Sequence, residues 1–131
     1  MNDDEKRAYV QYRLEAARKI FDAAVVLAES SFWNSAINRL YYAAFYAVGA
    51  LLVHSGILTK SHSATKSLFS QTFVKTGVFD QKYSRLFAKL FDSRQKGDYE
   101  DIFDFDAERV RPLFEPVKEL LDLVEQHIAA A

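Results

Sequence analysis

The chain has 131 residues, the usual size of one domain, so we expect a single domain spanning residues 1–131. Half of its residues are hydrophobic and 27% are charged, which predicts a folded globular chain and excludes intrinsic disorder. The absence of cysteine excludes a disulfide-stapled secreted protein and a thiolate metal site. A formal net charge of −1 argues against a protein that coats nucleic acid through a general excess of positive charge.

The N-terminal residues and the most apolar segment both bear on localisation. Met1 to Glu5 are polar and acidic, whereas a signal peptide needs basic residues followed by an apolar run. The segment from Leu40 to Val53 is too short to cross a bilayer and contains three tyrosines. We therefore expect a cytoplasmic protein with no membrane association.

Two long helices are predicted first, over residues 3–30 and 34–54. In the first, apolar residues recur at three- and four-residue steps and acidic residues fill the first turn. The second is apolar around nearly its whole circumference, as expected of a central helix. Asn34 or Ser35 is its predicted N-cap, and Gly56 follows its end.

Two shorter helices should follow. Ser61 is the predicted cap of the third helix, which stops near Gly77. Asp80 is the predicted cap of the fourth helix, and Gly97 marks its expected end.

A fifth helix is predicted from about Asp106 to Ile128, with a kink or a late start at Pro112 and Pro116, which lack an amide donor. Because no strand pattern appears and the loops are short, the predicted fold class is all-α, an up-and-down bundle of four or five helices.

The order of the helices also predicts which residues meet. If consecutive helices are antiparallel, the end of the second, the start of the third, the end of the fourth and the start of the fifth lie at one pole. That pole would gather His54, His62, Arg94, Asp98, Tyr99 and Asp101. Asn38 and Arg39 would lie nearer the opposite end.

Three segments together resemble the HEPN family over nearly the whole chain. They are NRLYYAAFYA at residues 38–47, KSH at 60–62 and RQKGDY at 94–99. The resemblance implies a bundle of about five helices that forms a homodimer. It also implies a two-component, toxin–antitoxin-like system with a small nucleotidyltransferase as protein partner, and metal-independent RNA cleavage in some branches.

Ribonuclease branches of the family carry an arginine and a histidine separated by four to six residues. A guanidinium can stabilise a phosphate transition state while an imidazole moves a proton near neutral pH. The positions that follow Arg94 at this spacing hold Tyr99, Glu100 and Asp101, so the histidine is missing. His62 or Tyr99 would have to replace it, and an unperturbed tyrosine, with a pKa near ~10, is poorly matched to this role.

Three interpretations follow. The leading one is a nucleotide- or RNA-binding component in which Arg94, Asp98, Tyr99 and His62 form a polar cleft near the dimer interface, with Arg94 on phosphate. The alternative is a metal-independent endoribonuclease in which Arg94 steadies the phosphate and His62 or Tyr99 moves protons. The third is a purely structural protein-interaction module.

The remaining polar residues have structural interpretations. Asn38, Arg39 and Tyr42 lie on an otherwise apolar helix and need partners once buried, which predicts an internal polar lock or a dimer contact. The aromatic residues around Tyr42 are predicted to serve the core and an interface rather than base stacking. Because no Gly-rich phosphate loop or metal-ligand histidine pair occurs, neither a cofactor nor a metal site is predicted.

Overall fold

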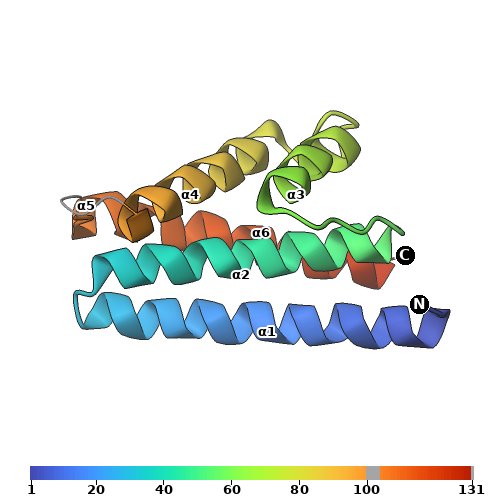
Figure 1. Cartoon of the computed structure of the whole chain (residues 1–131), viewed down its shortest axis with the longest axis horizontal. Coiled ribbons are helices and arrows are strands. Elements are labelled where there is room, and N and C mark those ends of the chain that lie inside the picture. The colour runs from blue at the N-terminus through green and yellow to red at the C-terminus, as the bar shows by residue number, and fades with distance from the viewer. Residues whose placement is uncertain (100–103, 131) are drawn as a thin grey trace.

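The structure is a computed structural model that describes residues 1–99 and 104–130, except for the side chain of Tyr99. All regular elements in these ranges are helical, which confirms the predicted all-α fold class (Figure 1). The long helices form an up-and-down bundle: α1 (Asp3–Glu29), α2 (Trp33–His54), α4 (Gln81–Tyr99) and α6 (Phe114–Ala130).

Short helical elements lie at the two ends of this bundle (Figure 1). At the end where α2 finishes, α3 (His62–Phe69) continues into a π-helical turn, η1 (Ser70–Val74). At the other end, α5 (Ala107–Val110) leads through a 3-10 turn, η2 (Arg111–Leu113), into α6. The expected interruption near Pro112 is therefore confirmed. Proline has no backbone N–H, so it cannot donate the hydrogen bond that would continue α5 as a regular α-helix.

α2 is the centre of the core. It packs against α1, α3, α4, α5 and α6, and its apolar side chains are buried around most of its circumference. By length and composition alone α2 could cross a membrane, but 67% of its most apolar window is buried inside the bundle. The apolar character of this helix is therefore explained by packing.

The helix caps agree with the predictions except in α2. Ser61 Oγ accepts a hydrogen bond from Ala64 N at 3.0 Å, and Asp80 Oδ1 accepts one from Lys82 N at 2.8 Å. The predicted cap of α2 was wrong, since the helix begins one residue earlier and its N-cap is Phe32, with no side-chain bond. Asn34 instead accepts a hydrogen bond from Phe105 N at 2.8 Å and so ties the segment before α5 to α2.

Gly97 does not end α4, which continues to Tyr99, so that prediction was also wrong. A Cβ atom on Gly97 would lie 3.4 Å from the Phe105 ring and 3.7 Å from Ile37. Gly97 therefore does not terminate α4. Its small size instead allows α4 to pack closely on α2 and on the segment before α5.

The predicted pole was wrong because the third helix does not run the length of the bundle. α3 and η1 have 8 and 5 residues, whereas α2 has 22, so they stay at one end. α4 therefore runs antiparallel to α2, back towards the end of the bundle where α2 begins (Figure 1). The end of α4 meets the start of α2, which brings Asp98 to Asn38 and leaves His54 at the opposite end.

Substitution of two helical glycines by alanine tests this packing. Alanine fits at Gly97 at ordinary contact distance, so we expect Gly97→Ala to raise the free energy of unfolding by about 0.5–1 kcal/mol through helix propensity. Gly49→Ala is the matched control, because its Cβ atom would lie 2.6 Å from Arg13 Nη2 and displace that side chain. Urea unfolding measures both variants, and a larger gain from Gly49→Ala would contradict the described packing.

Candidate functional site

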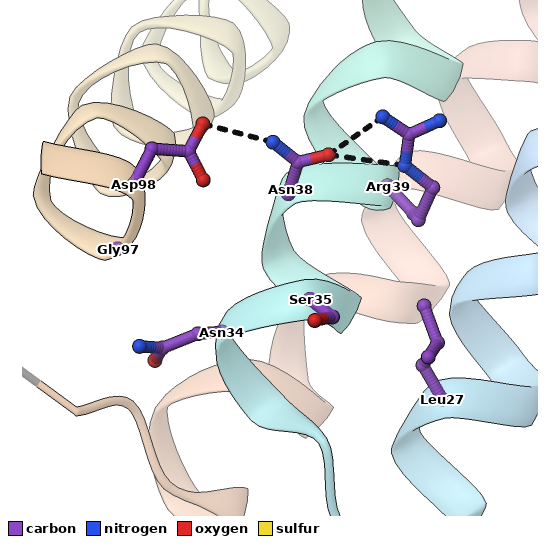
Figure 2. A pocket seen from close by; sticks show the side chains of 7 residues that line it. All are labelled: Leu27, Asn34, Ser35, Asn38, Arg39, Gly97 and Asp98. Carbon is purple, nitrogen blue, oxygen red and sulfur yellow. Dashed lines mark hydrogen bonds between the residues drawn. The ribbon is translucent and has the colours of Figure 1, made fainter.

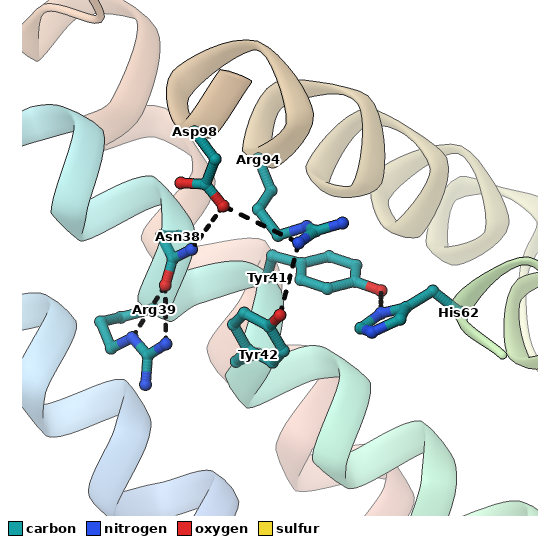
Figure 3. A network of polar contacts seen from close by, with 7 residues as sticks. All are labelled: Asn38, Arg39, Tyr41, Tyr42, His62, Arg94 and Asp98. Carbon is teal, nitrogen blue, oxygen red and sulfur yellow. Dashed lines mark hydrogen bonds and ion pairs between the residues drawn. The ribbon is translucent and has the colours of Figure 1, made fainter. Parts of the chain in front are cut away.

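A chain of polar contacts joins the start of α2 to the end of α4 (Figure 3). Asn38 Nδ2 donates a hydrogen bond to Asp98 Oδ2 at 2.9 Å. Asn38 Oδ1 accepts two more, from Arg39 Nε at 3.0 Å and from Arg39 Nη2 at 2.7 Å. One amide therefore holds a carboxylate on one side and a guanidinium on the other, which orients both charged groups.

Arg94 lies deeper in the same network and is only 7% exposed. Its Nη1 donates to the Tyr42 hydroxyl at 3.3 Å and lies 3.7 Å from Asp98 Oδ2. Its guanidinium also packs against two aromatic rings, 5.1 Å from the centroid of Tyr41 and 5.7 Å from that of Tyr42. A buried charge needs such compensation, so these contacts explain why the arginine can lie inside the bundle.

His62 approaches the network from the start of α3. Its Nδ1 lies 2.5 Å from the Tyr41 hydroxyl, and its ring stacks on Phe45 with 4.4 Å between centroids. Burial, and then the positive charge of Arg94, lower the pKa of His62 below its usual value of 6.5. The imidazole is therefore neutral at pH ~7.

A groove of about 550 Å³ opens beside this network, between the end of α1, the first turns of α2 and the end of α4 (Figure 2). Its lining consists of Leu27, Asn34, Ser35, Asn38, Arg39, Gly97 and Asp98. Arg39 is half-buried there, with its guanidinium 5.0 Å from the Tyr42 ring. Over the described ranges no carboxylate lies within ion-pair distance of Arg39, so its charge is available to an anionic ligand.

The structure brings together three of the four residues predicted to bind a nucleotide. Arg94, Asp98 and His62 all belong to the network around Tyr41, whereas the side chain of Tyr99 lies outside the described residues. Asp101 also lies outside them. His54 does not belong to this site and lines a separate hollow with the first turns of α1.

The groove itself was not predicted. Asn34 and Ser35 were interpreted as caps, and Arg39 as part of a lock, although all three line the groove. The available signal was that residues 34, 35, 38 and 39 follow the helical repeat and so form one polar stripe on an apolar helix. The structure shows that this stripe meets the last turn of α4.

Comparison with known proteins identifies the family. The HEPN domain model matches residues 10–127, so the chain belongs to the HEPN family, as the resemblance predicted. A UPF0332 protein of Thermotoga maritima is 34% identical over 125 residues, 95% of each chain. Two further relatives, both from Methanocaldococcus jannaschii, are named "Putative toxin MJ0142" and "Putative toxin MJ0605". MJ0142 is 32% identical over a match that covers 76% of this chain and 68% of MJ0142. MJ0605 is also 32% identical, over a match that covers 71% of this chain and 69% of MJ0605.

An exchange of residues tests the link between Asn38 and Asp98. In Asn38→Asp two carboxylates would face each other where a 2.9 Å hydrogen bond now lies, so we expect a loss of about 1–3 kcal/mol in unfolding free energy. Adding Asp98→Asn restores one donor and one acceptor and should recover most of this loss. Urea unfolding near neutral pH measures all three proteins, and a double variant less stable than Asn38→Asp would contradict the contact.

The lowered pKa of His62 predicts a dependence of stability on pH. Below about 6.5 the unfolded chain binds a proton that the folded protein takes up less readily, so acidification should decrease the unfolding free energy. We expect His62→Gln to lose less stability than wild type between about pH 7 and about pH 5. His54→Gln should independently change the pH profile in the same direction, because burial, Lys6 and His127 also lower the pKa of His54 at the other end of the bundle. Identical pH profiles of wild type and His62→Gln would contradict the assignment.

Proposed function

We propose that this HEPN protein is the nucleotide- or RNA-binding component of a toxin–antitoxin-like pair, and that a nucleotidyltransferase-type protein is its partner. The observation that carries the proposal is the polar network in which Asn38 joins Arg39 to Asp98 and Arg94 beside an open groove. The toxin names of two relatives support a role in such a pair. The partner itself rests on the family resemblance.

The chemistry of the groove suits a phosphate group. Phosphate oxygens accept hydrogen bonds, and a guanidinium donates them in a planar fork that fits such an anion. Arg39 donates directly in this proposal because it lies at the groove. Arg94, which is nearly buried, adds positive charge and holds Asp98, the carboxylate to which Asn38 is bonded.

The ligand site also includes His62 in this proposal, because His62 and Arg94 pack against the same Tyr41 ring. Asp98 orients Asn38 through a hydrogen bond and Arg94 through an ion pair, and the phosphate itself contacts Arg39 at the groove. Tyr99 remains a proposed contact at the end of α4. The proposed ligand site thus keeps the four residues predicted from the sequence, and Asn38 and Arg39 are added to them.

A homodimer is part of the proposal. Tyr12 and Val26 on α1 and Phe32 in the following turn are all exposed large hydrophobic residues, which supports an interface along this part of the molecule. Light scattering of the purified chain at micromolar concentration should give twice the mass of 15.0 kDa. A mass of one chain would contradict the dimer but would leave the ligand site untouched.

Binding of a labelled RNA tests the function. The probe is a 5′-fluorescein single-stranded RNA of about 12 nucleotides, with ATP as an unlabelled competitor. Arg39→Gln and Arg94→Gln should each weaken binding about tenfold or more, since a hydrogen bond to a charged group contributes roughly 1.5–3 kcal/mol. Arg7→Gln is the control, because it removes the same charge from a largely exposed side chain at the opposite end of the bundle. Unchanged binding in both site variants would overturn the proposal.

The same samples distinguish binding from catalysis. In EDTA we expect the RNA to remain intact, because the spacing of arginine and histidine used by ribonuclease branches is absent after Arg94. Cleavage by wild type that is lost in Arg94→Gln would contradict a pure binding role. It would support the endoribonuclease instead.

A further inference from the structure

The proton on the Tyr41 hydroxyl determines what His62 can do. Tyr41 is 0% exposed and its ring packs against those of Phe45 and Phe87, with centroid distances of 5.8 and 5.9 Å. Burial raises the pKa of the Tyr41 phenol well above its usual value, so the phenol keeps its proton at neutral pH. A buried hydroxyl needs an acceptor, and its partner in the described part of the chain is His62 Nδ1, at 2.5 Å.

Two arrangements of protons are conceivable for this bond, and they differ in cost. If Nδ1 carried the proton, it would donate to the phenol oxygen and the Tyr41 O–H would be buried without an acceptor, which is unfavourable. If the phenol donates, Nδ1 accepts and both groups are satisfied. The second arrangement places the proton of the neutral imidazole on Nε2.

The rest of the surroundings fixes the ring in this orientation. The imidazole stacks on Phe45 at an interplanar angle of 20°, and the Tyr42 ring meets it edge-on at 5.9 Å. His62 is also the first residue of α3, directly after the N-cap residue Ser61, so its backbone is held by the helix. Figure 3 shows Nδ1 directed at Tyr41 and the second ring nitrogen on the other side of the ring. His62 is half-buried, so Nε2 belongs to a side chain that a ligand can reach.

The second nitrogen has no acceptor in the protein as far as the described residues extend. A fixed N–H group without a protein acceptor, beside a nearly buried guanidinium, is a pre-organised donor for a ligand oxygen. Arg94 contributes the charge at this site, since its guanidinium lies 5.1 Å from the centroid of the same Tyr41 ring on which His62 packs.

We propose that His62 binds the ligand as a neutral hydrogen-bond donor, with Nε2–H directed to a phosphate oxygen and with Tyr41 as the positioning residue that keeps the proton on Nε2. The identity of the ligand as a phosphate compound rests on the proposed function. Because Nε2 already carries a proton, His62 cannot accept one from a ribose hydroxyl through this nitrogen. The site is thereby suited to binding and not to proton abstraction.

The proton position is measured without any ligand. Long-range ¹H–¹⁵N correlation spectra of the full chain labelled with ¹⁵N-histidine distinguish the two neutral tautomers and the cation. At about pH 7 we expect the Nε2–H form for His62 in the wild type and a mixture of tautomers in Tyr41→Phe. A wild-type His62 that is cationic or carries its proton on Nδ1 would overturn the inference.

Two substitutions then separate the two ring nitrogens. Glutamine places its amide near the position of Nε2, whereas asparagine places its amide near Nδ1, close to Tyr41. We expect His62→Gln to bind the labelled RNA within about threefold of wild type, and His62→Asn to bind about tenfold more weakly. Equal affinities of the two variants, or tighter binding by His62→Asn, would overturn the donor role, because a merely structural bond to Tyr41 favours asparagine.

The outcome also separates this inference from the function on which it rests. If wild type binds neither the RNA nor ATP, the proposed function fails and the ligand role of His62 fails with it, while the tautomer measurement still decides the role of Tyr41. If Arg94→Gln weakens binding and the two His62 variants do not differ, only the inference fails. Competition by ATP as strong as by unlabelled RNA would identify the free nucleotide as the source of the bound phosphate, whereas competition by RNA alone would identify the nucleic acid.

Discussion

The burial of α2 on nearly all sides is the constraint on which the rest of the structure depends. A helix packed against every other long helix supplies the core, but each polar group that it carries must find a partner inside the bundle. Asn38, Tyr41 and Tyr42 find theirs on α3 and α4. The positions of these two elements are thus set by polar contacts as well as by apolar packing.

The same contacts create the candidate site. Arg94 and Asp98 lie one helical turn apart on α4, and their charges meet a phenol and an amide from the polar side of α2. Because the amide of Asn38 also orients Arg39, an internal structural contact positions a guanidinium at the open groove. If the proposed function is correct, stability and ligand binding depend on the same network, in which the buried side chains orient the accessible ones.

The helices and the family could be predicted from the sequence because they depend on local patterns. The apolar repeat of α2, the cap at Ser61 and the interruption at Pro112 all express short-range rules, and the structure confirms them. The meeting of Asn38 with Asp98 depends on where α3 stops, which the repeat does not encode. Gly97 was misinterpreted for a related reason, since the Phe105 ring that packs closely against it is a tertiary contact.

Mapping of the RNA contact by NMR tests the central claim most directly. An assigned ¹H–¹⁵N spectrum of the full chain is recorded while the single-stranded RNA is added. We expect the largest shifts at the start of α2 around Asn38 and Arg39, at His62, and at Arg94 on α4. Shifts confined to the opposite end of the bundle, around Lys6 and His54, would contradict the account.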